Sequence, residues 1–213
     1  MLPIVVDTRL RPSGAQGPLV VTLDSFERYQ REEAWTWEHM ALTRARVVFG
    51  SIEARFATQA IINAILSHPR DRQELVAAAT KMREDIALHK PPTGLLDVKL
   101  CEGGLVDLEF ALHVTQLNSG KALDPHIGTA IALLVEAGLV SPGIAKAYRL
   151  LTRILVTARL VAPDLQSPSE ATCALIASAC DQPDWPSLLA ALDTVRQDVS
   201  RFWQGISAAP KGD

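Results

Sequence analysis

Apolar residues recur at spacings of three and four along most of the chain, a pattern typical of helices that bury one face. The pattern lapses where proline or glycine is expected to end a helix, as at Gly120, Pro163 and Pro183. Between these stops it predicts helices over 52–67, 71–89, 104–118, 125–138, 142–162, 169–181 and 185–207. Seven helices with short connections indicate an all-α bundle over residues 51–213.

The first 50 residues show a different pattern. β-prone runs at 3–10 and 18–23 flank a turn rich in Pro, Ser and Gly, so both are expected to be strands. Residues 44–49 are expected to return as a further strand that ends at Gly50. The predicted fold is therefore mainly α, with a small incomplete α+β part over residues 1–50 in front of the bundle.

Two helices are expected between these strands. Asp24 or Ser25 can cap a helix that runs to about Arg31, and a very apolar helix should cover 34–43. Trp35 and its apolar neighbours leave that second helix almost no polar face, which indicates burial between the small sheet and the bundle. Its few charged residues then need partners, because an unpaired charge is costly to bury.

Charge and hydropathy exclude several classes of protein. The net charge of the 213 residues is −3 and no Lys/Arg run is present, which argues against nucleic-acid or anionic-membrane binding. No apolar run approaches the roughly 20 residues that span a bilayer. The three cysteines form no Cys-x-x-Cys pair, and an odd count does not suit a disulfide framework. We therefore expect a cytoplasmic protein without a membrane partner.

Charged residues alternate along the first predicted strand. Because the side-chain period of a strand is two, Asp7, Arg9 and Arg11 would share one face. A carboxylate is a hard ligand for Mg²⁺ and arginine grips phosphate oxygens, so this face suits metal-dependent phosphoryl chemistry. A surface ladder of salt bridges is the alternative interpretation of the same pattern.

Several long motifs resemble the C-terminal adenylyltransferase half of the bifunctional glutamine synthetase adenylyltransferase/adenylyl-removing enzymes. The motifs are VDTRLRPSG at 6–14, GPLV at 17–20, AWTWEHMALTRAR at 34–46, DVKL at 97–100, GGLVDLEF at 103–110 and the tail from Val195 to Trp203. The resemblance implies transfer of AMP from ATP to a tyrosine of glutamine synthetase, with Mg²⁺, under control of the PII signal protein. It also implies that residues 1–50 are the C-terminal part of a nucleotidyltransferase domain.

The chain departs from this family in one respect. The family carries a glycine-rich turn and an Asp-x-Asp pair upstream of the strand that holds Asp7, and neither is present here. Asp7 would then be one of three metal carboxylates, with Arg9 and Arg11 steadying the triphosphate. We expect Met1 to be a fragment boundary or an internal start, and the chain to be inactive without the missing upstream part of the enzyme as its partner.

Further residues are candidates for nucleotide contact. The loop that holds Ser13 and Gly14 could turn backbone amides towards phosphate, although it also fits an ordinary connection between strands. Arg44 and Arg46, at the end of the apolar helix, could contact nucleotide or substrate; structural pairing at a domain junction is the alternative.

A second candidate group precedes the helix predicted at 104–118. Exposed amides at Gly103 and Gly104 could receive an anion, with Lys99 adding positive charge, whereas Asp107 in the first turn could cap the helix instead. Asp107 and Glu109 are about 200° apart around a helix and cannot hold one ion together. We expect Asp107 to face the nucleotidyltransferase part and Glu109 to pair across the domain junction.

Two functions from different classes follow. The chain is either part of an adenylyltransferase, or a non-catalytic helical module that binds glutamine synthetase, PII or the missing part of its own enzyme. The histidines have no metal-ligand spacing and are expected to be core or surface fillers.

Overall fold

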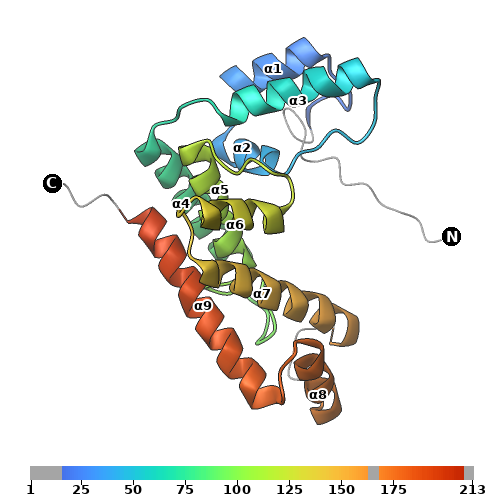
Figure 1. Cartoon of the computed structure of the whole chain (residues 1–213), viewed down its shortest axis with the longest axis vertical. Helices are drawn as coiled ribbons and strands as arrows, with labels where there is room; N and C mark the ends of the chain where they lie inside the picture. The colour runs from blue at the N-terminus through green and yellow to red at the C-terminus, as the bar shows by residue number, and fades with distance from the viewer. Residues whose placement is uncertain (1–15, 163–167, 209–213) are drawn as a thin grey trace.

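A computed structural model of the protein describes residues 16–162 and 168–208. Within these ranges the chain forms nine helices and no strand (Figure 1). The helices are α1 (Leu23–Glu32), α2 (Thr36–Leu42), α3 (Ile52–Leu66), α4 (Arg72–His89), α5 (Leu105–Ser119), α6 (Ile127–Glu136), α7 (Pro142–Val161), α8 (Glu170–Ala179) and α9 (Trp185–Ser207). The seven helices predicted beyond residue 50 are all present, with ends within two residues of the expected ones, and the mainly α class is confirmed.

The strands expected at 18–23 and 44–49 are wrong. Both segments are irregular, and α1 already begins at Leu23, capped by Thr22. A strand needs backbone partners, and the described residues contain no neighbouring strand that could supply them. The expected strand at 3–10 lies outside the described residues.

Most helices begin where a short polar side chain can accept hydrogen bonds from first-turn amides. Such a cap satisfies donors that have no partner within the helix. The capping side chains are Thr22, Ser51, Asp71, Ser141, Ser169 and Asp184. No described helix combines the length and apolar character needed to cross a membrane.

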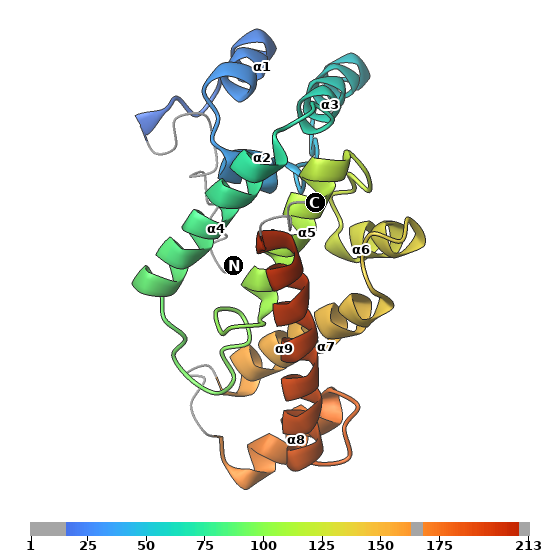
Figure 2. The ribbon, with the colours of Figure 1, turned by 90° about the vertical axis from the view of Figure 1, so that its left-hand side faces the viewer.

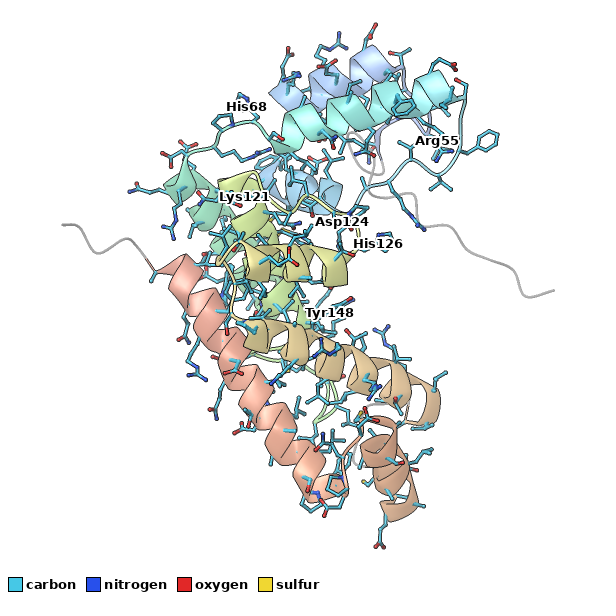
Figure 3. All side chains as sticks on the ribbon, viewed as in Figure 1. Arg55, His68, Lys121, Asp124, His126 and Tyr148 are labelled. Atoms are coloured by element: carbon cyan, nitrogen blue, oxygen red, sulfur yellow. The ribbon has the colours of Figure 1, made fainter. Side chains whose placement is uncertain are left out.

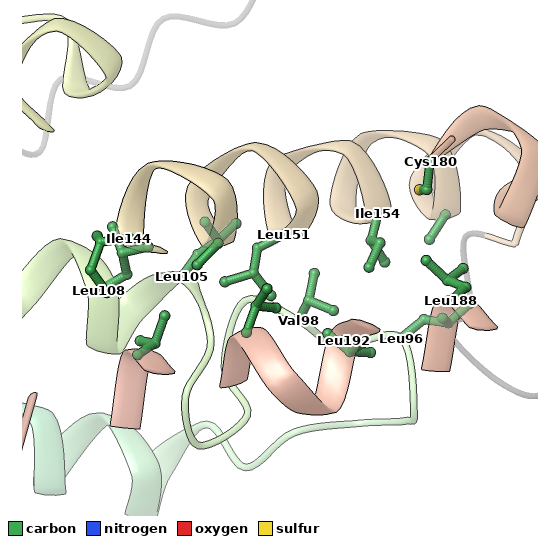
Figure 4. Close-up of a cluster of buried hydrophobic side chains, with 14 of the residues drawn as sticks. Leu96, Val98, Leu105, Leu108, Ile144, Leu151, Ile154, Cys180, Leu188 and Leu192 are labelled. Carbon is green, nitrogen blue, oxygen red and sulfur yellow. The ribbon is translucent and has the colours of Figure 1, made fainter. Parts of the chain in front are cut away.

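The helices form an elongated molecule with α1 and α3 at one end and α8 at the other (Figures 1 and 2). The larger core lies among α5, α6, α7, α8 and α9, and the loop before α5 contributes the fully buried Leu96 and Val98 to it (Figure 4). The smaller core joins α2, α3, α4 and α5.

Side chains from both sides of residue 50 share the smaller core. Met40 and Leu42 of α2 are buried together with Ile62 and Ile65 of α3. Trp35 precedes α2 and is 71% exposed, so the expected complete burial of this helix is wrong at its start. The division of the chain into residues 1–50 and 51–213 stays a prediction.

A buried polar chain also links the end of α2 to α5. The Nδ1 atom of His113 lies 2.9 Å from both Thr43 Oγ1 and Gln116 Oε1, and the Gln116 amide donates to the carbonyl of Ala122. Because Thr43 donates its own hydroxyl proton to the Met40 carbonyl, Nδ1 must carry the imidazole proton. His113 Nε2 is buried without a described hydrogen-bond partner.

This arrangement makes the stability of the fold pH-dependent. Burial lowers the pKa of His113 from 6.5 to about 4, against the opposing hydrogen bond to Gln116, and the charge of Arg44 adds to the decrease. The unfolded chain therefore takes up the proton first as pH falls. The free energy of unfolding should decrease from about pH 6.5 down to about pH 4, by on the order of 3 kcal/mol in total from this group.

Urea unfolding between pH 7.5 and pH 4.5 tests this expectation. His113→Asn keeps a donor near Nδ1 but cannot titrate, so it should flatten the pH dependence, whereas the matched change His126→Asn at an exposed histidine should not. Equal pH dependence in wild type and His113→Asn would contradict the assignment.

Candidate functional site

Five of the candidate residues lie outside the described residues. They are Asp7, Arg9, Arg11, Ser13 and Gly14, and their roles stay predictions. Within residues 16–162 and 168–208, no group of three His, Cys, Asp or Glu side chains is placed to hold a metal ion.

Arg44 pairs with a carboxylate whose pKa also responds to the charge of Lys99. Arg44 follows α2 and forms an ion pair of 3.1 Å with Glu109 of α5, with side-chain exposures of 42% and 28%. Burial raises the pKa of Glu109, and the charges of Arg44 and Lys99 oppose the increase. Glu109 thus pairs with a residue from the first 50, as the sequence predicts, and two candidate cations lie close to it.

Arg46 lies in a different place. It lines a shallow groove of about 480 Å³ with Arg55, Phe56 and Gln59 of α3. Figure 3 shows Arg55 near the start of α3. Arg55 could not be recognised from the sequence, because one exposed arginine on a helix indicates no site by itself. Only the fold of the loop before α3 places Arg46 in the same groove.

The Gly103-Gly104 pair has a structural explanation. A Cβ atom on Gly103 would collide with the Arg196 carbonyl oxygen of α9, and one on Gly104 would lie 2.6 Å from the carbonyl oxygen of Val98. The Gly103 amide donates to Asp107 Oδ2 at 2.6 Å, and the Gly104 amide to the Cys101 carbonyl at 2.9 Å. Both amides proposed for an anion are already engaged within the protein.

Asp107 is buried and paired within the helical part of the chain. It forms an ion pair with Arg83 of α4, with side-chain exposures of 3% and 11%, and Arg83 also donates to the carbonyl of Leu100. Asp107 therefore holds the backbone just before its own helix and pairs with Arg83, in contrast to the expected orientation towards the first 50 residues. Arg83 could not be recognised from the sequence, because no Asp or Glu lies three or four residues away from it in the chain.

Asp97 orders the preceding loop in a similar way. It is 4% exposed and accepts hydrogen bonds from the backbone amides of Thr93 and Leu100. Asp97 of DVKL and Asp107 of GGLVDLEF thus hold this loop in place, while Lys99 between them is exposed.

A further cleft of about 510 Å³ lies between α1, α2 and the start of α4, with His39, His68 and Arg70 in its wall. His39 Nε2 contacts the Gln30 carbonyl at 2.9 Å, and Arg70 donates to the carbonyls of Ile65, Leu66 and His68 at the end of α3. These contacts join α2 to α1 and fasten the loop before α4 to the end of α3, and burial lowers the pKa of His39.

Gly103→Ala tests whether the glycine is required by the approach of α9. Gly103 and Gly138 both have φ of +69°, but no atom lies within 4 Å of a Cβ added to Gly138. Gly138→Ala should cost only the backbone strain of about 1 kcal/mol, whereas Gly103→Ala should cost about 1–3 kcal/mol more. Urea unfolding of the two variants measures the difference, and equal losses would show that the contact with Arg196 does not matter.

The chain is similar in sequence to a known family of enzymes. Residues 3–61 match the family described as glutamate-ammonia ligase adenylyltransferase. The bifunctional glutamine synthetase adenylyltransferase/adenylyl-removing enzyme of Agrobacterium fabrum (strain C58) is 42% identical over an alignment of 213 positions, which covers 96% of this chain and 21% of that enzyme.

Two further relatives carry the same name. The protein of Rhodopseudomonas palustris (strain TIE-1) is 37% identical over 91% of this chain, and that of Xanthobacter autotrophicus (strain Py2) is 38% identical over 94%; each match covers 21% of the relative. The chain thus spans about a fifth of the length of the curated relatives that it matches. By sequence it belongs to the glutamine synthetase adenylyltransferase/adenylyl-removing family, and it matches one segment of these longer enzymes.

Proposed function

We propose that the chain is part of an adenylyltransferase that transfers AMP from ATP to a tyrosine of glutamine synthetase. The observation that carries the proposal is the 42% identity to the Agrobacterium fabrum enzyme over 96% of this chain. Because that match covers only 21% of the relative, we propose that the chain is inactive without the rest of the enzyme. Glutamine synthetase and the PII protein are its proposed partners, ATP and Mg²⁺ its substrate and cofactor, and the cytoplasm its location.

The role proposed for the described cations is phosphate binding. One Arg44 nitrogen donates to Glu109, and the side chain remains 42% exposed, so the guanidinium is oriented and still accessible. Lys99 is exposed as well, whereas Arg46 lines the separate groove with Arg55 and Phe56 and is not included in this role. Asp7 stays the proposed metal ligand, Arg9 and Arg11 the proposed triphosphate contacts, and Ser13 and Gly14 a proposed phosphate-facing turn.

A chimera tests the proposed function. In it, this chain replaces the matching segment of the Agrobacterium fabrum enzyme, and the purified chimera is incubated with labelled ATP, Mg²⁺ and glutamine synthetase. We expect the chimera to label glutamine synthetase, and neither the isolated chain nor the enzyme without the segment to do so. A cooperatively unfolding chimera that transfers no label would contradict the proposal; label transferred by the isolated chain would refute the need for the rest of the enzyme.

Arg44→Ala in the same chimera tests the phosphate role. Loss of a charged hydrogen-bond donor should lower the labelling rate about tenfold or more, while the exposed ion pair with Glu109 should contribute under about 1 kcal/mol to stability. Arg153→Ala is the matched control, because Arg153 also forms an exposed ion pair, with Asp181. Equal labelling by the two variants would reduce Arg44 to a structural partner of Glu109.

A further inference from the structure

Exposed large apolar side chains are concentrated in the segment that matches the family. Nine of them lie among the 46 described residues up to residue 61, and eight lie among the 142 described residues that follow. All three exposed aromatic residues fall in the first group: Trp35, Phe49 and Phe56. The helices beyond residue 61 cover their apolar faces far better than this segment does.

Four of these side chains lie close together in the chain where α3 begins. Val48 and Phe49 precede α3 and are 82% and 94% exposed, and Ile52 and Phe56 are 65% and 71% exposed. Ile52 and Phe56 are four residues apart and so lie on one side of the helix. We name these four residues the α3 apolar face.

The α3 apolar face adjoins the shallow groove of about 480 Å³. Ile52 and Phe56 line this groove together with Arg46 and Arg55, and none of the described residues in its wall is acidic. Exposed apolar clusters with a polar rim are typical of protein interaction sites. The two guanidiniums favour a partner that carries carboxylates beside its apolar side chains.

We propose that the α3 apolar face is covered by the remaining part of the same enzyme, through an apolar surface with acidic residues that pair with Arg46 and Arg55. The face lies inside the family match at 3–61, and the relatives are about five times as long as this chain. The inference rests on the proposed function, because it takes the chain to be one part of a longer enzyme. The four exposed apolar side chains would then be covered by another part of the same polypeptide.

Hydrogen–deuterium exchange tests the proposal in the chimera described above. Peptides that cover residues 46–59 should exchange about tenfold more slowly in the chimera than in the isolated chain, because a covering partner suppresses local opening. Peptides around Leu88 and Leu160, which are 76% and 78% exposed, should exchange at the same rate in both proteins. Glutamine synthetase is left out of this comparison.

Paired substitutions then test which side chains are covered. Phe49→Ser with Phe56→Ser in the chimera should abolish the protection of 46–59, while Leu88→Ser with Leu160→Ser should leave it unchanged. Arg55→Glu should reduce the protection if the partner surface is acidic, and unchanged protection would refute the charge complementarity.

Three results would overturn the proposal. They are equal exchange of 46–59 in both proteins, protection that develops in the isolated chain as its concentration rises, and protection that develops only when glutamine synthetase is added. The second would assign the face to another copy of this chain, and the third to the substrate protein. Labelling of glutamine synthetase is measured separately. A chimera that labels glutamine synthetase but shows no protection of residues 46–59 refutes this inference alone. A chimera that protects residues 46–59 but does not label glutamine synthetase refutes the proposed function alone.

Discussion

The buried ion pair between Arg83 and Asp107 determines how the central helices pack. A charge pair inside a protein is tolerated only if further hydrogen bonds satisfy both groups, and here the Gly103 amide and the Leu100 carbonyl do so. Arg83 belongs to α4 and Asp107 begins α5, while Gly103 lies against the backbone of α9. One polar cluster therefore links α4 and α5 beside the backbone of α9, and separating α4 from α5 would leave a buried charge unpaired.

The helices could be predicted from the sequence because their signals are local. Ser51, Asp71 and Asp184 each precede a run with helical spacing, and each caps a helix at the expected place. The strand expected at 44–49 failed for the opposite reason. Val48 and Phe49 have the composition of a strand, but a strand also needs a backbone partner from elsewhere in the chain, and local composition does not show whether one is present.

The candidate site could be predicted only in part, because its contacts are distant in sequence. The pairing of Glu109 with a residue of the first 50 follows from the cost of an unpaired charge, and it was expected. The Gly103-Gly104 pair was expected to offer its amides to an anion, whereas the structure places the carbonyl of Arg196, more than 90 residues later, against Gly103. No local pattern distinguishes a glycine that admits a helix backbone from one that admits a phosphate.

The contacts at the end of α2 restrain the loop that carries Val48 and Phe49, and so affect how readily this surface binds a partner. Thr43 bonds to the buried His113, and Arg44 pairs with Glu109, so α5 holds the chain at two successive residues just before the loop that carries Val48 and Phe49. A loop tied so close to its start loses less conformational entropy on binding than a free one. The α3 apolar face is therefore partly preorganised by the same helix that carries Asp107, which links the central packing to the surface proposed for the rest of the enzyme.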